Sequence, residues 1–257
     1  MKKVTENIGH QNMNSFKNHV TAVLNDNVDE YNEDIKPRGK GAEITIDENT
    51  AATTIDTHDA WHAIYDDTEE RFAEGFSTKK GERTVIGSIK GSAENNNVGV
   101  TAVAHECEAG DIVTIVGTDN FNGIYVVDKV LDSDNLVVQA EQPIDETEEG
   151  GAIILGNQII CEGNWGHKRT SYFLSGTPAV NNKSYAFALL VYKASSGEVS
   201  QCDKCLTRVR AQNATEYFNV GTSIIINWEE GDRISLAVKC ETDDSNLTIA
   251  EADICTI

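Results

Sequence analysis

The chain has 257 residues, of which 42 are acidic and 21 basic, so its formal net charge at pH 7 is −21. This charge excludes a general binder of nucleic-acid backbones, because affinity for phosphates comes largely from cationic side chains that release counterions. Hydrophobic residues make up 39% of the chain and charged residues 25%, ordinary values for a protein with a buried core. The length predicts one or two domains.

The N-terminal segment is polar. Residues 4–14 lack the run of about 7–15 apolar residues that a signal peptide needs, and no stretch approaches the roughly 18 apolar residues of a membrane span. We therefore expect no secretion by that route and no contact with a membrane. Without secretion, the cysteines are expected to be reduced thiols in small core sites, not three disulfides. They are Cys107, Cys161, Cys202, Cys205, Cys240 and Cys255.

An amphipathic helix is predicted after Asn14 and Ser15, because apolar residues follow them at spacings of three and four. The apolar positions are Phe16, Val20, Val23, Leu24, Val28 and Tyr31. The helix either packs on its own domain or trimerises or docks on a partner, and its isolation in a strand-like sequence keeps both alternatives open. A proline and two glycines at 36–41 then predict a linker.

From about Ala42 the pattern changes to short runs rich in Thr, Ile and Val, which is typical of β-strands. Between residues 95 and 155, four such runs separated by turns predict a small β-barrel. The runs are 98–103, 111–116, 125–127 and 136–138. The aromatic turn around Phe121 and Tyr125 could be a contact site, but Phe121 is expected to fill the core of the barrel. Later runs recur about every ten residues to the end of the chain, which predicts a β-sandwich.

The segment from Tyr185 to Ile257 has a distinct order of strands and turns. An apolar strand is followed by a Gly-Asp turn at 231–232, a strand Ile-Ser-Leu-Ala-Val, a hydrophilic loop and a final strand. This order resembles the trimeric jelly-roll knobs of bacteriophage fibre and capsid-decoration proteins, which are similar in fold to tumour-necrosis-factor-like domains. The sequence at 50–64 is similar to the first strand of that family.

The resemblance implies a mainly β protein with three parts. These are an N-terminal helix and linker at 1–41, a jelly-roll knob formed by 42–94 and 156–257, and an inserted small barrel at 95–155. The family members are virion structural proteins. We therefore expect a trimeric head fibre or capsid-decoration protein that is assembled in the host cytoplasm and located on the virion, without enzymatic activity or a cofactor.

The resemblance also implies partners. The N-terminal segment would attach to the major capsid protein or to another virion protein, and the knob would form a homotrimer. Candidates for the trimer interface are Tyr185, Phe187, Leu189 and Val191, because the strand at 186–191 is apolar on both faces, as a strand between a core and a subunit contact would be. Two alternatives remain open: a tail-associated knob that recognises host surface glycans, and a glycan-degrading virion enzyme.

Two short motifs suggest metal or redox chemistry. Cys202 and Cys205 form a C-x-x-C motif, which could be half of a zinc site or a redox pair, but no second pair at matched spacing completes a zinc site. We expect free thiols in a turn. His58 and His62 are four residues apart on an expected strand, where they would lie about 13 Å apart, too far for one metal ion.

Acidic clusters at several positions have the oxygen ligands that calcium prefers, but none follows the spacing of an EF-hand loop. The clusters lie at 66–70, 146–149, 229–232 and 243–244, and we expect them to be solvated turns. Nucleophile-elbow, zincin and P-loop motifs are absent from the sequence, so no catalytic or metal-binding residue is predicted.

Overall fold

The structure is a computed structural model that describes residues 40–65, 68–92 and 94–257. The predicted N-terminal helix, with its apolar positions Phe16, Val20, Val23, Leu24, Val28 and Tyr31, lies outside these residues. The described part of the chain is strands and turns, with one short 3₁₀ turn and no α-helix, so the mainly β fold class is confirmed. Consequently, no helix in this part is long and apolar enough to cross a membrane.

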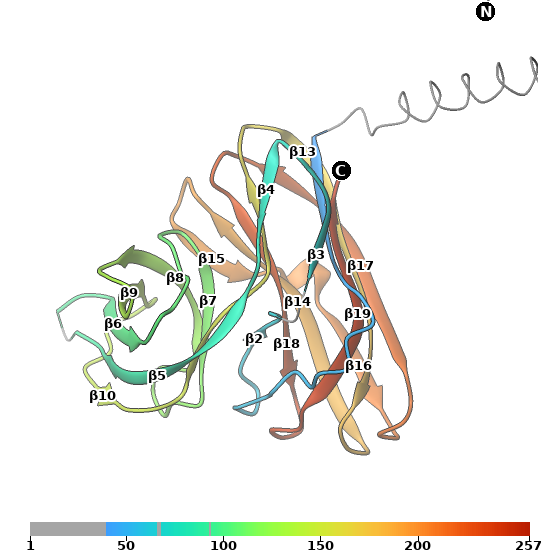
Figure 1. Ribbon diagram of the computed structural model, residues 1–257, viewed down its shortest axis with the longest axis horizontal. Helices are drawn as coiled ribbons and strands as arrows, with labels where there is room; N and C mark the ends of the chain where they lie inside the picture. Colours follow the sequence, from blue (N-terminus) through green and yellow to red (C-terminus); the bar gives the residue numbers. More distant parts are fainter. Residues whose placement is uncertain (1–39, 66–67, 93) are drawn as a thin grey trace, which may run out of the picture. The chain divides into compact units, whose positions relative to one another are not determined.

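Two antiparallel sheets form a β-sandwich (Figure 1). The first sheet has the order β17 (Phe218–Trp228), β13 (Gly166–Pro178), β19 (Leu247–Thr256), β1 (Gly41–Ile46) and β3 (Glu69–Glu74). The second has the order β15 (Glu198–Gln201), β14 (Lys183–Lys193), β18 (Arg233–Cys240), β12 (Gln158–Cys161) and β4 (Phe76–Lys79). In addition, β16 (Thr207–Ala211) pairs with β14, and β2 (His62–Ala63) pairs with β18.

The core of the sandwich lies between these sheets and is rich in aromatic side chains. Phe218 packs against Tyr185 and Phe187, with ring centroids 6.3 and 5.7 Å apart. Trp228 is fully buried, and its indole N–H donates to the Thr170 hydroxyl at 3.2 Å. The one polar atom of this large side chain is thus satisfied, and the core can bury the whole ring without an unpaired donor.

The remaining strands form a closed, six-stranded antiparallel barrel. Its order is β5 (Glu82–Lys90), β11 (Ala152–Leu155), β7 (Ile112–Val116), β8 (Gly123–Val130), β9 (Asn135–Gln139) and β6 (Asn97–Ala102), and pairing of β6 with β5 closes it. The short β10 (Thr147–Glu148) adds to β5. Phe121 is completely buried in the barrel core, which confirms its predicted place, and its carbonyl accepts the Tyr125 hydroxyl at 2.9 Å.

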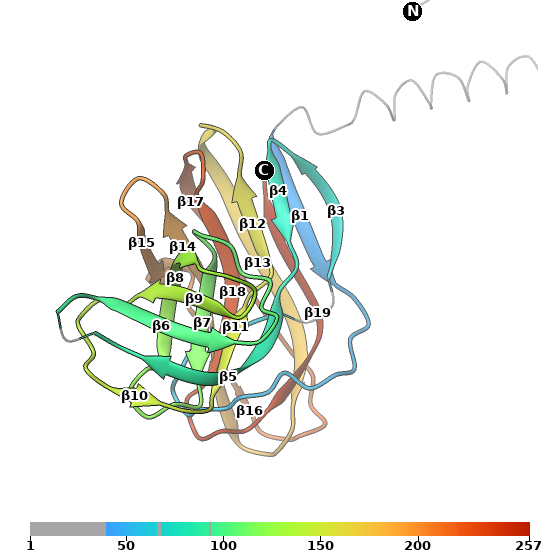
Figure 2. The same cartoon turned by 60° about the vertical axis from the view of Figure 1, so that its left-hand side comes forward.

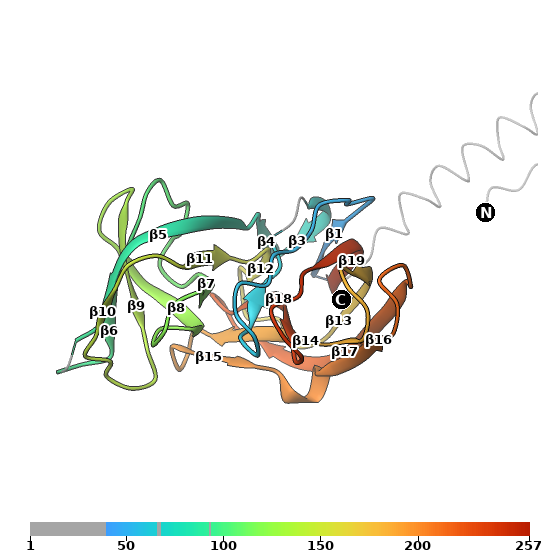
Figure 3. The ribbon, with the colours of Figure 1, turned by 90° about the horizontal axis from the view of Figure 1, so that it is seen from below.

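The barrel begins earlier in the chain than the predicted range of 95–155, because β5 belongs to it. The chain enters the barrel between β4 and β5 and leaves it between β11 and β12, and these two crossings lie side by side (Figure 3). The Gly81 N–H donates to the side-chain amide oxygen (Oδ1) of Asn157, on the other crossing, at 2.7 Å. A Cβ on Gly81 would meet the Leu155 oxygen at 2.3 Å, so the close approach requires glycine.

Candidate functional site

A buried carboxylate at the start of β7 ties the barrel to the sandwich. Asp111 is 0% exposed, and it accepts hydrogen bonds from the Lys79 ammonium at 2.7 Å and from the Glu108 N–H at 2.7 Å. The Arg233 guanidinium pairs with its second oxygen and also donates to the Ala109 carbonyl at 3.1 Å. Both cations come from sandwich strands, so burial of this charge depends on the two parts staying together.

Neutral hydrogen bonds strengthen the same junction. The buried Gln158 amide, on sandwich strand β12, accepts from the Ile112 N–H at 3.2 Å and donates to the Ile112 carbonyl at 3.4 Å. The hydroxyl of Thr114 accepts from the Ala63 N–H at 3.0 Å. The Gln158 side chain thus bonds the backbone of Ile112, at the start of β7, and the Thr114 side chain bonds the backbone of β2. These bonds fix the orientation of the barrel on the sandwich.

An apolar contact completes the junction and corrects one prediction. Strand β14 alternates between two buried faces. Its first face, with Tyr185, Phe187 and Leu189, packs in the sandwich core of a single chain, and all three side chains are 0% exposed. Its second face is covered by Trp61 and Ile112 from the same chain, which pack on Ala186, Ala188 and Leu190.

Tyr185, Phe187 and Leu189 therefore cannot form a trimer interface, because a partner could reach them only if the sandwich opened. Val191, the fourth candidate, is partly buried and packs against the same core. The strand is apolar on both faces because the barrel junction, and not a second subunit, covers the outer one. The sequence pattern correctly predicted that both faces of β14 are buried. It could not show which part of the protein covers the outer face.

A groove opens beside this junction, where barrel strand β8 lies next to sandwich strand β15 (Figure 2). It comprises two adjoining hollows of about 560 and 500 Å³, which share Ile124, Glu141 and Val199 among their lining residues. The Trp61 ring and the side chains of Ile124 and Val199 give it an apolar component. Glu141 and Gln201 contribute carboxylate and amide groups. Such a mixture can bind a ligand that has both apolar faces and hydrogen-bonding groups.

Charges at the end of the groove are paired. The Lys239 ammonium lies 5.5 Å from the centre of the Trp61 ring and donates to the Asp59 carboxylate at 2.6 Å. That hydrogen bond from Lys239 lowers the pKa of the Asp59 carboxyl. Nearby, the Gln201 amide donates to the Asp203 carboxylate at 2.8 Å. The side chains of Asp59, Glu141 and Asp203 thus line the groove, and we expect it to disfavour strongly anionic ligands.

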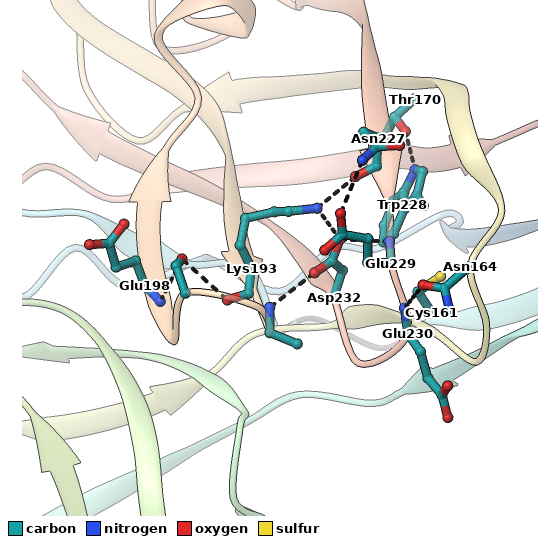
Figure 4. Close-up of polar contacts among 12 residues, drawn as sticks. Cys161, Asn164, Thr170, Lys193, Glu198, Asn227, Trp228, Glu229, Glu230 and Asp232 are labelled. Carbon is teal, nitrogen blue, oxygen red and sulfur yellow. Dashed lines mark hydrogen bonds and ion pairs between the residues drawn. The ribbon is translucent and has the colours of Figure 1, made fainter.

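The acidic cluster at 229–232 serves the fold (Figure 4). Asp232 is almost fully buried and pairs with Lys193, and it accepts hydrogen bonds from the N–H groups of Ala194 at 3.0 Å and Glu229 at 2.9 Å. Lys193 also donates to the Asn227 carbonyl at 2.6 Å. The carboxylate of Asp232 thus holds the turn between β17 and β18 against the end of β14. The expectation of a solvated turn is wrong for this residue.

The histidine pair does not converge on a site. His62 is 0% exposed, its Nε2 accepts from the Asp56 N–H at 2.9 Å, and its Nδ1 donates to the Ala60 carbonyl at 2.9 Å. Burial lowers the pKa of His62. His58 is exposed, and both ring nitrogens of His62 are already used. Among residues 40–65, 68–92 and 94–257, no group of three or more His, Cys, Asp or Glu side chains is arranged to hold a metal ion.

All six cysteines are free thiols, and Cys107, Cys161, Cys205 and Cys240 are buried, as predicted for thiols that fill core sites. Cys202 and Cys205 lie at the 3₁₀ turn η1 (Asp203–Cys205), which confirms their predicted place in a turn. The sequence analysis missed Asp111. Its position directly after a Gly, before a run of apolar residues, was the available signal, but a lone aspartate there is also typical of an exposed turn.

No family model and no curated protein matches the chain. Among solved structures, it is weakly similar to the tumour-necrosis-factor protein Eiger of S. frugiperda, with 9% identity and a TM-score of 0.29 over 68% of this chain and 92% of that one. A Listeria monocytogenes protein described as uncharacterized matches at 9% identity and a TM-score of 0.22. A cycloalternan-forming enzyme from Listeria monocytogenes, in complex with a pentasaccharide substrate, matches at 10% and 0.23. Both Listeria matches cover 80% of this chain and 29% of the other, and likenesses this weak say nothing of function.

Proposed function

We propose that this chain is a structural protein of a bacteriophage particle, a trimeric head fibre or capsid-decoration protein. It would project its β unit, the sandwich together with the barrel, from the surface of the particle. The order of strands and turns from Tyr185 to Ile257 supports the proposal. The observation that carries it is the junction at Asp111, because buried ion pairs and apolar packing make the sandwich and barrel a single body. A displayed domain must keep its shape in dilute surroundings, and this junction provides that rigidity.

The trimer requires a contact surface other than the one predicted on β14. The outer face of the first sheet has three exposed apolar side chains: Phe173 is 43%, Ile225 59% and Ile257 57% exposed. Ser171 on β13 lies opposite Ser223 on β17, while Arg169 lies opposite Ile225 and Asp253 opposite Phe173, so apolar, polar and charged positions are mixed on this face. A face with both apolar and charged positions suits a self-complementary or ring-forming contact with further copies of the chain.

Mass photometry tests the trimer. The full chain should form trimers, whereas a variant with Phe173→Glu and Ile225→Glu should remain folded but become monomeric, because charges would be buried in the contact. The matched control is Val85→Glu, since Val85 is 66% exposed on the barrel and should leave the trimer intact. A monomeric wild-type chain would remove the trimer from the proposal.

Cryo-electron microscopy of particles tests the location. Density for the β unit is expected on the head, with residues 1–41 toward the capsid. Deletion of residues 1–41 should leave a folded β unit that no longer joins particles. Incorporation of the truncated chain would contradict attachment through the N-terminal segment, and density on the tail alone would favour the second candidate.

The second candidate is a tail-associated knob that recognises host surface glycans, and the groove between β8 and β15 favours it. Sugar rings have apolar faces that can pack on Ile124 and Val199, and hydroxyl groups that can donate to Glu141 and pair with Gln201. The carboxylates in the groove favour a neutral glycan over an acidic one. The third alternative, a glycan-degrading virion enzyme, would require that the chain degrade a polysaccharide.

Glycan-array binding tests this candidate. The wild-type chain should bind neutral host glycans, and the double variant Glu141→Ala and Gln201→Ala should lose that binding by tenfold or more, on the order of 1.4 kcal/mol. Glu149→Ala, in an acidic loop apart from the residues that line the groove, is the control and should bind normally. Equal binding by both variants would place any glycan contact elsewhere.

A further inference from the structure

The turn at Cys202 and Cys205 has the geometry that a disulfide needs. The Cys205 N–H donates to the Cys202 carbonyl at 3.1 Å, which closes a four-residue turn. Such turns hold the first and fourth Cα atoms within about 7 Å, and disulfides span about 4.4–6.8 Å between Cα atoms. The Cys205 thiol also donates to the Cys202 carbonyl oxygen at 3.3 Å.

The two thiols differ in access. Cys202 is half-buried and lines an open hollow of about 310 Å³, together with Lys193 and Ser200. Cys205 is 0% exposed and lies behind it. A small reagent can therefore reach the first sulfur but not the second. This is the arrangement of an attacking cysteine with a resolving cysteine beside it.

The turn is anchored to the sandwich at both cysteines. The Cys202 N–H donates to the Leu189 carbonyl at 2.8 Å, and the Cys205 carbonyl accepts the Tyr172 hydroxyl at 2.9 Å. These bonds restrain the backbone on either side of the motif. Closure of a disulfide then requires rotation of the side chains rather than rearrangement of the sheet.

We propose that Cys202 and Cys205 are an oxidisable dithiol that closes to a disulfide within the turn when it meets a low-molecular-weight disulfide. The Cys202 thiolate attacks one sulfur of that disulfide, whose S–S bond breaks and releases one thiolate. Cys205 gives its proton to solvent, and its sulfur attacks the Cys202 sulfur and releases the second thiolate. The protein loses two protons and two electrons, and the small disulfide is reduced to two thiols.

The other cysteines lack this combination. Cys107, Cys161 and Cys240 are buried, and none of them has an accessible cysteine within a few residues along the chain. Cys255 is half-buried, and it too has no cysteine nearby along the chain. Burial raises the pKa of Cys107 and that of Cys205 alike to about 12, so the accessible neighbour, Cys202, distinguishes the turn. Oxidation under native conditions should therefore be confined to the turn.

Incubation of the reduced full chain with glutathione disulfide, without denaturant, tests the proposal. Intact mass spectrometry should show a transient glutathione adduct, followed by a product about 2 Da lighter than the starting protein. Peptide mapping should place the bond between Cys202 and Cys205, and the native thiol count should fall by two. The wild-type time course alone decides the matter, so the test does not depend on whether a variant folds.

Variants identify the role of each sulfur. Cys205→Ser should accumulate a stable glutathione adduct on Cys202, because the resolving thiol is absent, whereas Cys202→Ser should leave Cys205 unmodified. Cys255→Ser is the control and should oxidise as the wild type does. A persistent adduct on wild-type Cys202, a disulfide to any other cysteine, or two thiols that remain reduced would overturn the proposal. Neither the virion location nor the glycan groove enters this test.

Discussion

Arg233 on sandwich strand β18 pairs with Asp111, the buried carboxylate at the start of barrel strand β7, which also accepts a hydrogen bond from Lys79 at 2.7 Å. Residues 122 positions apart in the chain are thereby joined by charge at a site that excludes water. The barrel is therefore part of the folded unit that contains the sandwich. If the barrel separated from the sandwich, Lys79 and Arg233 would lose Asp111 as their partner.

Removal of the Asp111 carboxylate should destabilise the fold. Asp111→Ala is expected to lower the free energy of unfolding by about 3–5 kcal/mol, because Arg233 loses its carboxylate in a buried site and Lys79 keeps only the exposed Glu108, at 3.4 Å. Urea denaturation followed by fluorescence measures the change. Lys40→Ala breaks the exposed pair with Glu74 and serves as the control, with an expected change below about 1 kcal/mol. Equal changes in the two variants would show that Asp111 does not hold the junction.

The buried His62 predicts a pH dependence of stability. Its folded-state pKa is lowered by burial, so the unfolded chain binds a proton more readily than the folded one. The stabilisation is fully present above the unfolded pKa of about 6.5 and is lost as the pH falls below that value toward the folded pKa.

Thermal melts between pH 7.5 and 5 should therefore show a steeper fall in Tm for the wild type than for His62→Gln, whose amide can replace both hydrogen bonds without titrating. His58→Gln is the control, because His58 is exposed and should retain the wild-type slope. A slope unchanged in His62→Gln would mean that the loss of stability in acid comes from other groups.

The barrel core should depend on Phe121. Phe121→Ala is expected to destabilise the protein by about 3–5 kcal/mol, because it removes a fully buried ring and leaves a cavity. Val85→Ala, at an exposed position, should change stability by less than about 0.5 kcal/mol. Hydrogen exchange of barrel amides would locate the effect, and unchanged protection of β7 and β8 in Phe121→Ala would contradict it.

The crossing between barrel and sandwich should not tolerate a side chain at Gly156. A Cβ there would lie 2.1 Å from the Ser235 hydroxyl and 2.9 Å from the Ala63 Cβ. Gly156→Ala should therefore reduce Tm, whereas Gly99→Ala, where the nearest atom would be 3.8 Å away, should change it little. Proteolysis at the crossings should accelerate only in Gly156→Ala, and equal rates would indicate that the crossing can relax.

The sequence predicted the strand content and the burial of Phe121, because alternation and turn residues depend on local chemistry. It could not predict what covers β14. Ala186 and Leu190 are apolar in the same way whether the barrel or another subunit packs on them. Likewise, β5 is rich in Thr, Val and Ile like the sandwich strands, and only its pairing with both β6 and β11 assigns it to the barrel.

The groove was beyond prediction for a similar reason. Trp61 and Glu141 are 80 positions apart, and they line one hollow only because the two crossings bring the barrel back to the sandwich. The C-x-x-C motif was visible in the sequence, but the difference in access between Cys202 and Cys205 depends on the strands around the turn. The sequence pattern identifies residues of interest. What surrounds those residues in the fold depends on contacts with residues distant in the chain.

Because the two crossings lie side by side, the barrel could in principle be replaced by another domain. Glu82 and Leu155, at its two ends, are paired across β5 and β11, so a tight hairpin between those strands could shorten the chain without moving the sandwich. Such a deletion would uncover Ala186, Ala188 and Leu190 and would leave Lys79 and Arg233 without Asp111, so polar replacements at the apolar positions and uncharged replacements of the two cations would be needed. With that change, foreign domains whose termini lie close together could be grafted at this point, and the sandwich would serve as a display platform.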